Sequence, residues 1–163
     1  MKLTRKLLAL VAFLATVSFL KANDNATDTN ATVADVNSTR PESLSIIDNN
    51  LAEGHALKKP FTAIYFTASW CPACRGFSPK VADFNNEYGK ETNIVIVSAD
   101  GNNEFYKRYS VPWLVLKKSG HKQIADLFNI NYIPKIVLLD PDGQQMDRDD
   151  WKKRKEKWNT TNK

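Results

Sequence analysis

Residues 61–77 of this 163-residue chain have the sequence FTAIYFTASWCPACRGF. The first seven are almost all apolar or β-branched, which is typical of a strand covered on both faces. Large apolar residues then recur at the spacing of one helix face, at Phe77, Val81, Phe84 and Tyr88. The stretch therefore predicts a buried strand over 61–67 that passes, through two cysteines, into a long helix.

The rest of the chain continues this alternation of strand and helix. The sequence predicts further strands at 94–98, 136–139 and 144–146 and further helices at 104–109, 121–128 and 149–158. Asp-Pro-Asp-Gly at 140–143 has the residues that a tight turn requires. Trp151 and Trp158, seven residues apart, lie on the helix face expected to pack on the sheet. This order of elements indicates a three-layer α/β fold.

The two cysteines stand at the predicted start of the long helix, close enough for a disulfide within one turn. Cys71 takes the N-cap position, where free backbone N–H groups and the helix dipole stabilise a thiolate and lower the thiol pKa. Pro72 suits the first helical position, where its missing N–H costs nothing, and Arg75 adds a positive charge. Cys74 is expected to be more buried and to attack a mixed disulfide formed on Cys71.

Other uses of the cysteine pair compete with redox exchange. A zinc site needs two more ligands; the chain has no second cysteine pair and only two histidines, so no metal site is expected. Cu(I) held by the two thiolates and a purely structural disulfide remain as alternatives. His55 and His121 lie beside Gly54 and Gly120 in polar segments, where we expect exposed side chains rather than catalytic ones.

These residues resemble the thioredoxin superfamily, particularly its tryparedoxin and nucleoredoxin branch. The resemblance covers about residues 44–150. It is carried by YFTASWCPACRGF at 65–77, VPWL at 111–114, FNINYIP at 128–134 and VLLDPDG at 137–143. It implies a thioredoxin-like three-layer sandwich, with a mixed central sheet and helices on both faces.

The resemblance also implies roles for individual residues. Cys71 corresponds to the surface nucleophile and Cys74 to the resolving thiol. Trp70 corresponds to the ring that packs beside the active site, and Pro134 to a cis proline opposite the dithiol. The backbone of Ile133 would then face outward and bind an extended substrate strand.

Three further positions bear on the resemblance. Thioredoxin itself has a buried Asp six residues before its first cysteine, serving proton transfer with the resolving thiol; this chain has Tyr65 there, as the tryparedoxin-like branch would have it. Lys135 follows Pro134 where Thr is commoner; we expect it to point to solvent, the alternative being a preference for acidic partners. Pro79, eight residues after Cys71, matches the proline that kinks this family's long helix.

The N-terminal part of the chain differs in composition from the rest. Residues 1–22 carry four basic residues and no acid, and they include the apolar run LLALVAFLATVSFL at 7–20. This pattern predicts a secretory signal peptide cleaved after Ala22, with an uncleaved membrane anchor as the alternative. Residues 23–43, rich in Asn, Thr, Asp and Ala, predict a disordered linker. Residues 44–163 then form the thioredoxin-like domain.

The net charge of +5 comes from the two ends of the chain. Residues 23–150 have 17 acidic residues against 13 basic ones. Nucleic-acid binding is therefore not expected, because it needs a basic face across the domain. The basic residues at 152–157 are expected to form a solvated face, with docking to an acidic partner or to anionic lipid head groups as the alternative.

Together these patterns predict an exported thiol–disulfide oxidoreductase, periplasmic or secreted, that is a monomer, has no bound cofactor and acts on protein disulfides. Pro-Ala between the cysteines lacks the His that stabilises the thiolate in strong oxidases, which favours the reductase or isomerase direction. An electron-donating redox protein, membrane-bound in an exporting bacterium, would restore the dithiol. The alternative function is a non-catalytic binding module on the same fold, either a Cu(I) carrier or a substrate-binding chaperone.

Overall fold

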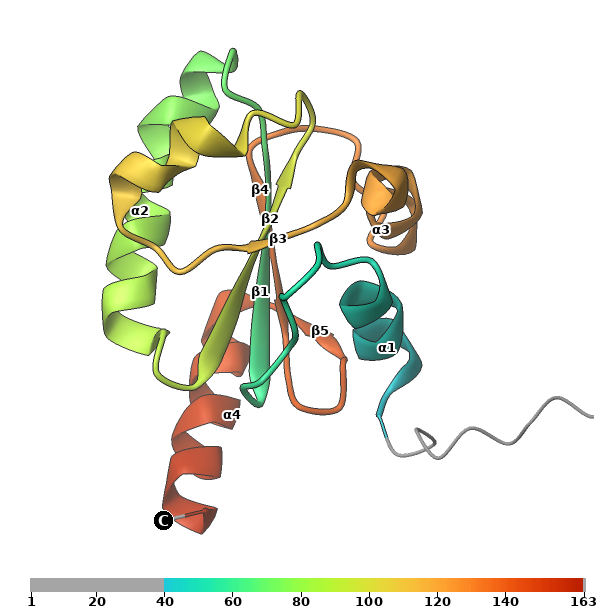
Figure 1. Cartoon of the computed structure of the whole chain (residues 1–163). Helices are drawn as coiled ribbons and strands as arrows, with labels where there is room; N and C mark the ends of the chain where they lie inside the picture. The colour runs from blue at the N-terminus through green and yellow to red at the C-terminus, as the bar shows by residue number, and fades with distance from the viewer. Residues whose placement is uncertain (1–39, 163) are drawn as a thin grey trace, which may run out of the picture. The chain divides into compact units, whose positions relative to one another are not determined.

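The computed structural model describes residues 40–162, with five strands between two layers of helices (Figure 1). The strands are β1 Phe61–Thr67, β2 Thr92–Ser98, β3 Leu114–Val115, β4 Lys135–Leu139 and β5 Gln145–Met146. They lie in the order β3-β2-β1-β4-β5, with β2 parallel to β1 and β3, and β4 antiparallel to β1 and β5. The predicted α/β sandwich with a mixed sheet is confirmed.

Helices cover both faces of this sheet. They are α1 Glu42–Asn49, α2 Pro72–Tyr88, α3 His121–Leu127 and α4 Arg148–Thr161, with the 3₁₀ helices η1 Asn103–Tyr109 and η2 Lys118–Gly120. One face carries α1 and α3, and the other carries α2, η1 and α4 (Figure 1). β1 is central, and all seven of its residues are buried because helices lie on both sides.

Successive side chains of β1 point to opposite faces and so belong to two different cores. Ile64 packs with Ile47 of α1 and Ile124 of α3. Phe61 and Tyr65 pack on the other face, against α2, η1 and α4. Full burial of side chains of this size contributes about 1.5–3 kcal/mol each. The carboxyl end of β1, where the cysteines follow, is therefore a rigid point of the fold.

The last helix is fastened by apolar and ionic contacts. Trp151 is fully buried, with its ring centroid 5.5 Å from that of Phe61, and Trp158 packs partly buried in the same core. Lys155 Nζ lies 2.9 Å from Glu91 Oε2. The hydrogen bond from Lys155 lowers the pKa of Glu91 below its ordinary value. The predicted packing of the two tryptophans on the sheet is confirmed.

The basic residues of α4 are only partly a solvated face. Arg154 Nη2 lies 3.1 Å from Asp140 Oδ2 and 2.6 Å from Asp142 Oδ2. Lys155 is buried in its contact with Glu91. The expectation of a solvated face is wrong for Lys155, which is buried, whereas Arg154 is exposed although acidic side chains distant in sequence lie beside it. Of the others, Lys153 and Lys157 are exposed and Lys152 is half-buried.

The folded domain begins slightly before the predicted boundary at Leu44. Helix α1 starts at Glu42, and Ser43 Oγ donates a hydrogen bond to the carbonyl oxygen of Gly143 at 2.9 Å. Composition assigned these residues to the linker because the contacts that order them come from residues 100 positions away along the chain.

The remaining N-terminal predictions fall outside the described residues. These are the signal peptide at 1–22 and the linker from residue 23 to residue 39. Among the helices of residues 40–162, none has the length and apolar character needed to cross a membrane.

Candidate active site

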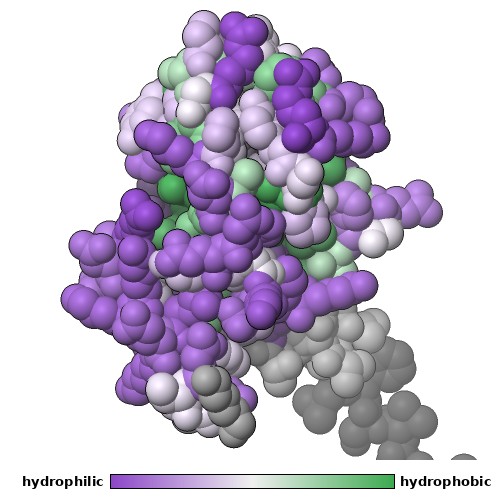
Figure 2. All heavy atoms as spheres, turned by 90° about the vertical axis from the view of Figure 1, so that its left-hand side faces the viewer, coloured by the Kyte–Doolittle hydropathy of each residue, from purple (hydrophilic) through white to green (hydrophobic). Residues whose placement is uncertain are grey.

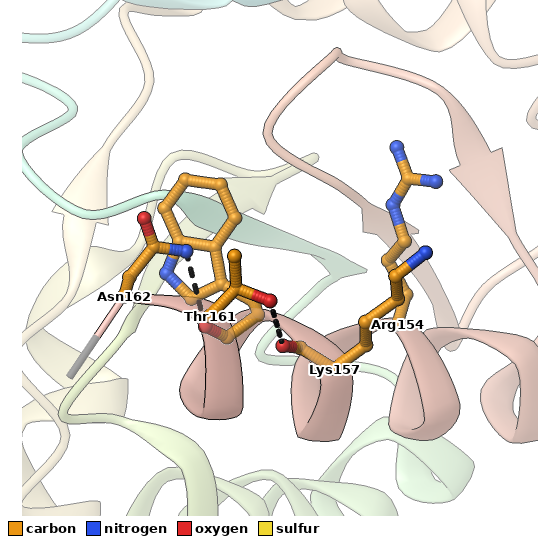
Figure 3. Close-up of a pocket in the computed structure, with 5 residues that line it drawn as sticks. Arg154, Lys157, Thr161 and Asn162 are labelled. Carbon is orange, nitrogen blue, oxygen red and sulfur yellow. Dashed lines mark hydrogen bonds between the residues drawn. The ribbon is translucent and has the colours of Figure 1, made fainter.

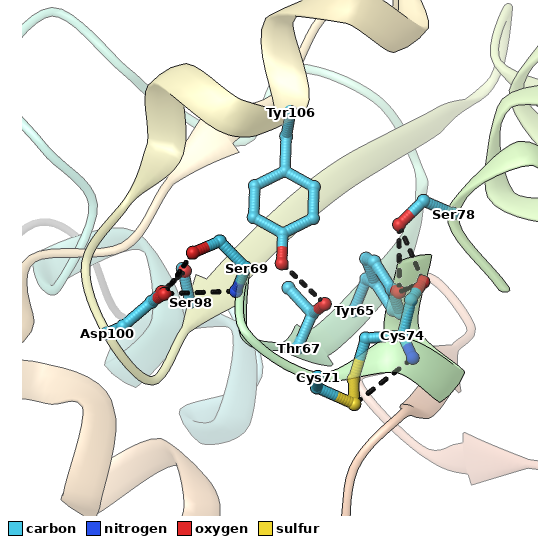
Figure 4. Close-up of a disulfide and its surroundings, with 9 residues drawn as sticks. All are labelled: Tyr65, Thr67, Ser69, Cys71, Cys74, Ser78, Ser98, Asp100 and Tyr106. Atoms are coloured by element: carbon cyan, nitrogen blue, oxygen red, sulfur yellow. Dashed lines mark hydrogen bonds between the residues drawn. A yellow bond between two sulfur atoms is a disulfide. The ribbon is translucent and has the colours of Figure 1, made fainter. Parts of the chain in front are cut away.

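The cysteine pair lies at the carboxyl end of β1, at the start of α2 (Figure 4). Cys71 is the N-cap of α2, and its Sγ accepts a hydrogen bond from the backbone N–H of Cys74 at 3.1 Å. Pro72 is the first residue of the helix, as predicted. The two cysteines are joined by a disulfide, with their Cα atoms 5.2 Å apart. A thiolate on Cys71 would therefore meet a backbone donor already aimed at it.

The two sulfur-bearing residues differ in accessibility in the predicted order. Cys71 is 6% exposed, whereas Cys74 has no exposed surface. Ile133 packs against both, together with Ala68. A partner that reaches this end of the molecule therefore meets Cys71 before Cys74.

The other predicted site residues gather around the pair. The Ile133–Pro134 peptide bond is cis, as the resemblance implies. Trp70 is 65% exposed, although it is a large apolar side chain. Arg75 lies exposed on the first turn of α2, beyond Cys74. The structure brings every predicted site residue to the same end of the sheet.

An apolar hollow of about 270 Å³ adjoins the site through Ile133. It lies between the carboxyl ends of β1 and β2 and helix α3. Its apolar lining includes Phe66, Val97, Ala125 and Ile130. A side chain that lies across the cis-proline loop can reach this hollow.

A second hollow, of about 400 Å³, lies at the end of α4 (Figure 3). Thr161 Oγ1 donates to the carbonyl oxygen of Lys157 at 3.0 Å, and Asn162 Nδ2 donates to that of Trp158 at 3.0 Å. These side chains satisfy the last carbonyl groups of the helix, which have no partner within it. Although it is larger than the hollow beside Ile133, it is remote from the cysteines, and we assign it to the helix end rather than to the reaction.

A buried pair of hydroxyl groups lies behind Cys74 (Figure 4). Tyr65 Oη and Ser78 Oγ each donate to the carbonyl oxygen of Cys74, at 3.0 and 2.9 Å, and the two oxygens are 3.1 Å apart. Burial raises the pKa of Tyr65, so its hydroxyl keeps its proton. Sequence analysis noted Tyr65 but missed Ser78. The available signal was the spacing, because a Ser four residues after Cys74 can bond back to its carbonyl group within a helix.

The loop before Cys71 is held by a carboxylate that sequence analysis also missed. Asp100 accepts hydrogen bonds from the backbone N–H and the hydroxyl of Ser69, at 3.0 and 2.5 Å, and from Ser98 Oγ at 2.6 Å. Burial acts to raise the pKa of Asp100, but these bonds outweigh it and lower the pKa to about 2. The ionised carboxylate thus ties the end of β2 to the residue before Trp70.

Lys135 is not simply directed to solvent, which corrects the sequence expectation. It is half-buried, and its Nζ donates to Tyr132 Oη at 3.0 Å and lies 4.9 Å from the centre of that ring. Tyr132 itself is 59% exposed. The positive charge is therefore held above an exposed aromatic ring on the cis-proline loop.

The two histidines are half-buried rather than exposed, so that expectation is wrong as well. His55 Nδ1 accepts from the backbone N–H of Val115 at 2.8 Å, and His121 Nε2 lies 3.2 Å from the carbonyl oxygen of Leu116. Both rings thus contact backbone in and just after β3. In the part of the chain from residue 40 to residue 162, no three or more His, Cys, Asp or Glu side chains are grouped to hold a metal ion.

Comparison with known proteins identifies the family. The family model described as Thioredoxin-like matches residues 60–145, more than half of the chain. The chain belongs to the thioredoxin-like family. Nucleoredoxin of Xenopus laevis is 34% identical over 104 residues, and tryparedoxin of Trypanosoma brucei brucei is 35% identical over 86 residues. These similarities confirm the predicted tryparedoxin and nucleoredoxin branch.

A solved structure agrees with this assignment. Tryparedoxin II from C. fasciculata superposes with a TM-score of 0.54 at 26% identity, covering 70% of this chain and 91% of that protein. The sequence matches are less complete: they cover 59% of this chain and 25% of the Xenopus nucleoredoxin, and 48% of this chain and 60% of the trypanosomal tryparedoxin. Together with the Cys71–Cys74 disulfide, the relatives indicate thiol–disulfide chemistry.

Proposed function

We propose that this protein is a thiol–disulfide oxidoreductase that exchanges disulfides with protein substrates, mainly in the reductase or isomerase direction. The observation that carries the proposal is the placement of the cysteine pair. Cys71 caps a helix with a backbone donor on its sulfur and a small exposed surface, and Cys74 lies fully buried one turn behind.

The proposed reaction has two displacements. The Cys71 thiolate attacks a substrate disulfide, so that a mixed disulfide forms and one substrate sulfur leaves as a thiolate. Cys74 then gives up its proton and attacks Cys71 Sγ, which releases the second substrate sulfur. The substrate gains two electrons and two protons, and the protein is left with the Cys71–Cys74 disulfide. An electron-donating redox protein, membrane-bound in an exporting bacterium, would reduce it again.

The surface around Cys71 supports a protein substrate. Trp70 and Tyr132 are exposed aromatic side chains, the residue type enriched where proteins bind one another. We propose that Trp70 and Ile133 contact the substrate chain and that Pro72, Arg75 and Pro134 shape and charge the site around the cysteines. The same reaction requires no bound cofactor, and we propose that the protein acts as a monomer and binds no nucleic acid.

Export remains part of the proposal. The basic start and the apolar run at 7–20 support a signal peptide. The test is to express the full chain, fractionate the cells and weigh the protein by mass spectrometry. Loss of residues 1–22 outside the cytoplasm is expected, whereas a full-length chain in the membrane fraction supports the anchor instead.

The activity is tested by reduction of insulin with dithiothreitol. Wild-type protein is expected to accelerate the reaction, and Cys71→Ser is expected to abolish the acceleration. If wild type gives no acceleration, or if Cys71→Ser is as fast as wild type, the enzyme proposal is wrong and a binding module takes its place.

The substrates are identified by trapping. Cys74→Ser leaves Cys71 free to form mixed disulfides that are not resolved, so partners remain bound through a reducible bond. Cys71→Ser is the matched control, because it keeps the second cysteine and the fold but lacks the attacking sulfur. Protein partners captured by both variants alike would contradict the assigned roles.

A further inference from the structure

The resolving cysteine is held by an all-hydroxyl network that the proposed reaction has not yet used. Tyr65 comes from β1 and Ser78 from α2, and both bond to the carbonyl oxygen of Cys74 (Figure 4). All three residues are fully buried. In this arrangement two neutral side chains on different elements direct hydroxyl groups at the backbone carbonyl oxygen of one cysteine.

The number of protons constrains what this network can do. Each hydroxyl carries one hydrogen, yet the three oxygens make three short contacts of 2.9 to 3.1 Å. Only two of the contacts can hold a proton at once. In each of the three possible arrangements at least one hydroxyl hydrogen points at the Cys74 carbonyl oxygen. Burial keeps the Tyr65 proton in place by raising the pKa of that residue.

The second displacement requires a negative charge on the Cys74 sulfur, which is buried away from water. Cys74 must be deprotonated to attack, and burial disfavours the charged form of a thiol. The elements packed around it carry titratable and charged groups: Tyr65 on β1; Arg75, Lys80, Asp83, Glu87 and Tyr88 on α2; Asp100 after β2; Glu104, Tyr106, Lys107, Arg108 and Tyr109 on η1; and Tyr132 and Lys135 on the cis-proline loop and β4. Of these groups, Tyr65 hydrogen-bonds to Cys74. The charged ones have other partners or are exposed: Asp100 bonds to Ser69, Lys135 to Tyr132, and Arg75 is exposed.

We propose that Tyr65 and Ser78 are positioning residues for the resolving step: their hydroxyl groups fix the Cys74 peptide and offset the negative charge that develops on the Cys74 sulfur. The inference rests on the proposed function and adds a site for its second displacement. In a low-dielectric interior, oriented hydroxyl dipoles stabilise a nearby anion more than they would in water. They act through the Cys74 backbone, which accepts their hydrogens.

The step itself is balanced by the mixed disulfide. The Cys74 sulfur forms a bond to Cys71 Sγ, the bond from Cys71 Sγ to the partner sulfur breaks, and the electron pair leaves with the partner. The proton released by Cys74 passes to the partner thiolate or, where that thiolate is a weak base, to water. Tyr65 and Ser78 are neither oxidised nor reduced, and they neither gain nor lose a proton.

The test separates the two displacements with an aromatic disulfide, 5,5′-dithiobis(2-nitrobenzoate). The reduced protein releases one coloured thiolate when Cys71 attacks and a second when Cys74 resolves, and stopped-flow absorbance follows both as a function of pH. Tyr65→Phe is compared with Tyr106→Phe. Tyr106 is the matched control, because it is equally buried in the same core but bonds to Thr67 Oγ1, at 2.8 Å.

The two variants are expected to behave differently. Tyr65→Phe slows the second release about 10-fold, the size expected for one hydrogen bond beside a charge, and moves the midpoint of its pH profile upward. It leaves the first release within about two-fold of wild type, since the Cys71 sulfur bonds to the Cys74 N–H instead. Tyr106→Phe leaves both releases as in wild type.

Ser78 provides a second, independent variant pair should Tyr65→Phe fail to fold. Ser78→Ala is expected to slow the second release by about two- to three-fold, because Tyr65 still donates directly to Cys74. Ser78→Thr keeps the hydroxyl and is expected to restore the wild-type rate and pH profile.

The outcomes distinguish this inference from the function on which it rests. If wild type releases both thiolates and Tyr65→Phe matches Tyr106→Phe in rate and pH profile, the positioning role is wrong and the oxidoreductase proposal stands. The positioning role is also wrong if Tyr65→Phe slows the second release without shifting its pH profile and Ser78→Thr is as slow as Ser78→Ala, because both results would indicate a structural effect. If wild type releases no thiolate, the proposed function fails and takes the inference with it.

Discussion

Two tryptophans at opposite ends of β1 differ in burial. Trp151 packs against Phe61 at the start of the strand and is fully buried, whereas Trp70 lies just beyond its end at Thr67 and is 65% exposed. Core packing explains the burial of the first ring, which fills space between α4, α2 and the sheet. Trp70 does not pack in the core. An apolar ring left in water beside a reactive sulfur contributes little to stability, and its exposure is consistent with the proposed contact with a substrate chain.

The same contrast holds for charge. At the start of β1, Glu91 is paired with the cationic Lys155, whereas at the other end Asp100 is satisfied by neutral hydroxyl and amide groups. The face covered by α2 and η1 shows the result in Figure 2, where hydrophobic atoms are visible between hydrophilic side chains in the upper half and the lower half is mostly hydrophilic. The contacts at one end of the molecule therefore stabilise the fold, and the other end is where we propose that partner contact and chemistry occur.

The largest effect is expected at the stable end. Trp151→Ala should lower the free energy of unfolding by about 3–5 kcal/mol, because it leaves a large cavity in the core. Chemical denaturation followed by far-ultraviolet circular dichroism measures this. Trp70→Ala is the matched control and should change the same free energy by no more than about 0.5 kcal/mol. If both variants lose the same free energy of unfolding, the two tryptophans do not differ in their contribution to stability.

The next effect is expected at the reactive end, in activity. Trp70→Ala should slow the attack on a protein disulfide about 10-fold, which corresponds to about 1.4 kcal/mol of contact. The attack on the small aromatic disulfide should hardly change, because a small molecule does not reach across the ring. Stopped-flow rates with both substrates measure the split. Equal slowing with the two substrates would mean that Trp70 shapes Cys71 rather than contacts the partner.

A smaller effect concerns acid stability. The pKa of Asp100 falls from an ordinary 3.8 to about 2 in the folded protein, so its stabilisation is present above pH 3.8 and is lost as the pH falls towards 2. Asp100→Asn should therefore destabilise the protein at pH 7 by less than about 1 kcal/mol, since the side chain is exposed and screened. Thermal unfolding from pH 7 to pH 2 measures this. A gap between wild type and variant that persists undiminished at pH 2 would show that the carboxylate charge is not the cause.

The smallest effect is expected from the charge on the cis-proline loop. Lys135→Glu should slow the reduction of an acidic peptide disulfide by about two- to three-fold at low salt, an effect that added salt removes. Lys153→Glu is the control, because it makes the same change of charge on α4, where Lys153 lies 3.4 Å from Asp150, rather than on the cis-proline loop. If both variants respond alike, only net charge matters, and Lys135 has no part in choosing substrates.

Sequence patterns predicted what is local. The apolar runs located β1 and β4 closely, and the N-cap position of Cys71 followed from strand, cysteine and proline in succession. The segment at 104–109 was recognised as helical but is a 3₁₀ helix, Asn103–Tyr109. β3, with two residues, is too short to leave a pattern, and α1 was missed because its buried side consists only of Leu44 and Ile47.

What sequence patterns missed is set by contacts between distant residues. Asp100 looks like any polar residue after a strand until the sheet brings it to Ser69, 31 positions earlier. The role of Tyr65 depends in the same way on Ser78, which lies on another element. The direction of the Lys135 side chain could be assigned only once the position of Tyr132, to which it donates a hydrogen bond, was known. Spacing along the chain carries none of these relations, since each depends on how the sheet and helices pack.

The hydrogen bond from Ser43 to Gly143 has a consequence for how this domain can be attached to anything else. It fixes α1 beside the turn after β4. Leu139, at the end of β4, pairs with Thr62 near the start of β1. The ring of Trp158, near the other end of the described residues, lies 6.1 Å from that of Phe61, also at the start of β1. Ser43 and Trp158, near the two ends of the described residues, thus lie about 20 Å, the length of a seven-residue strand, from the cysteine sulfurs. Attachment of a support or a fusion partner close to either of these two residues therefore leaves the end of the sheet that carries the cysteines unobstructed.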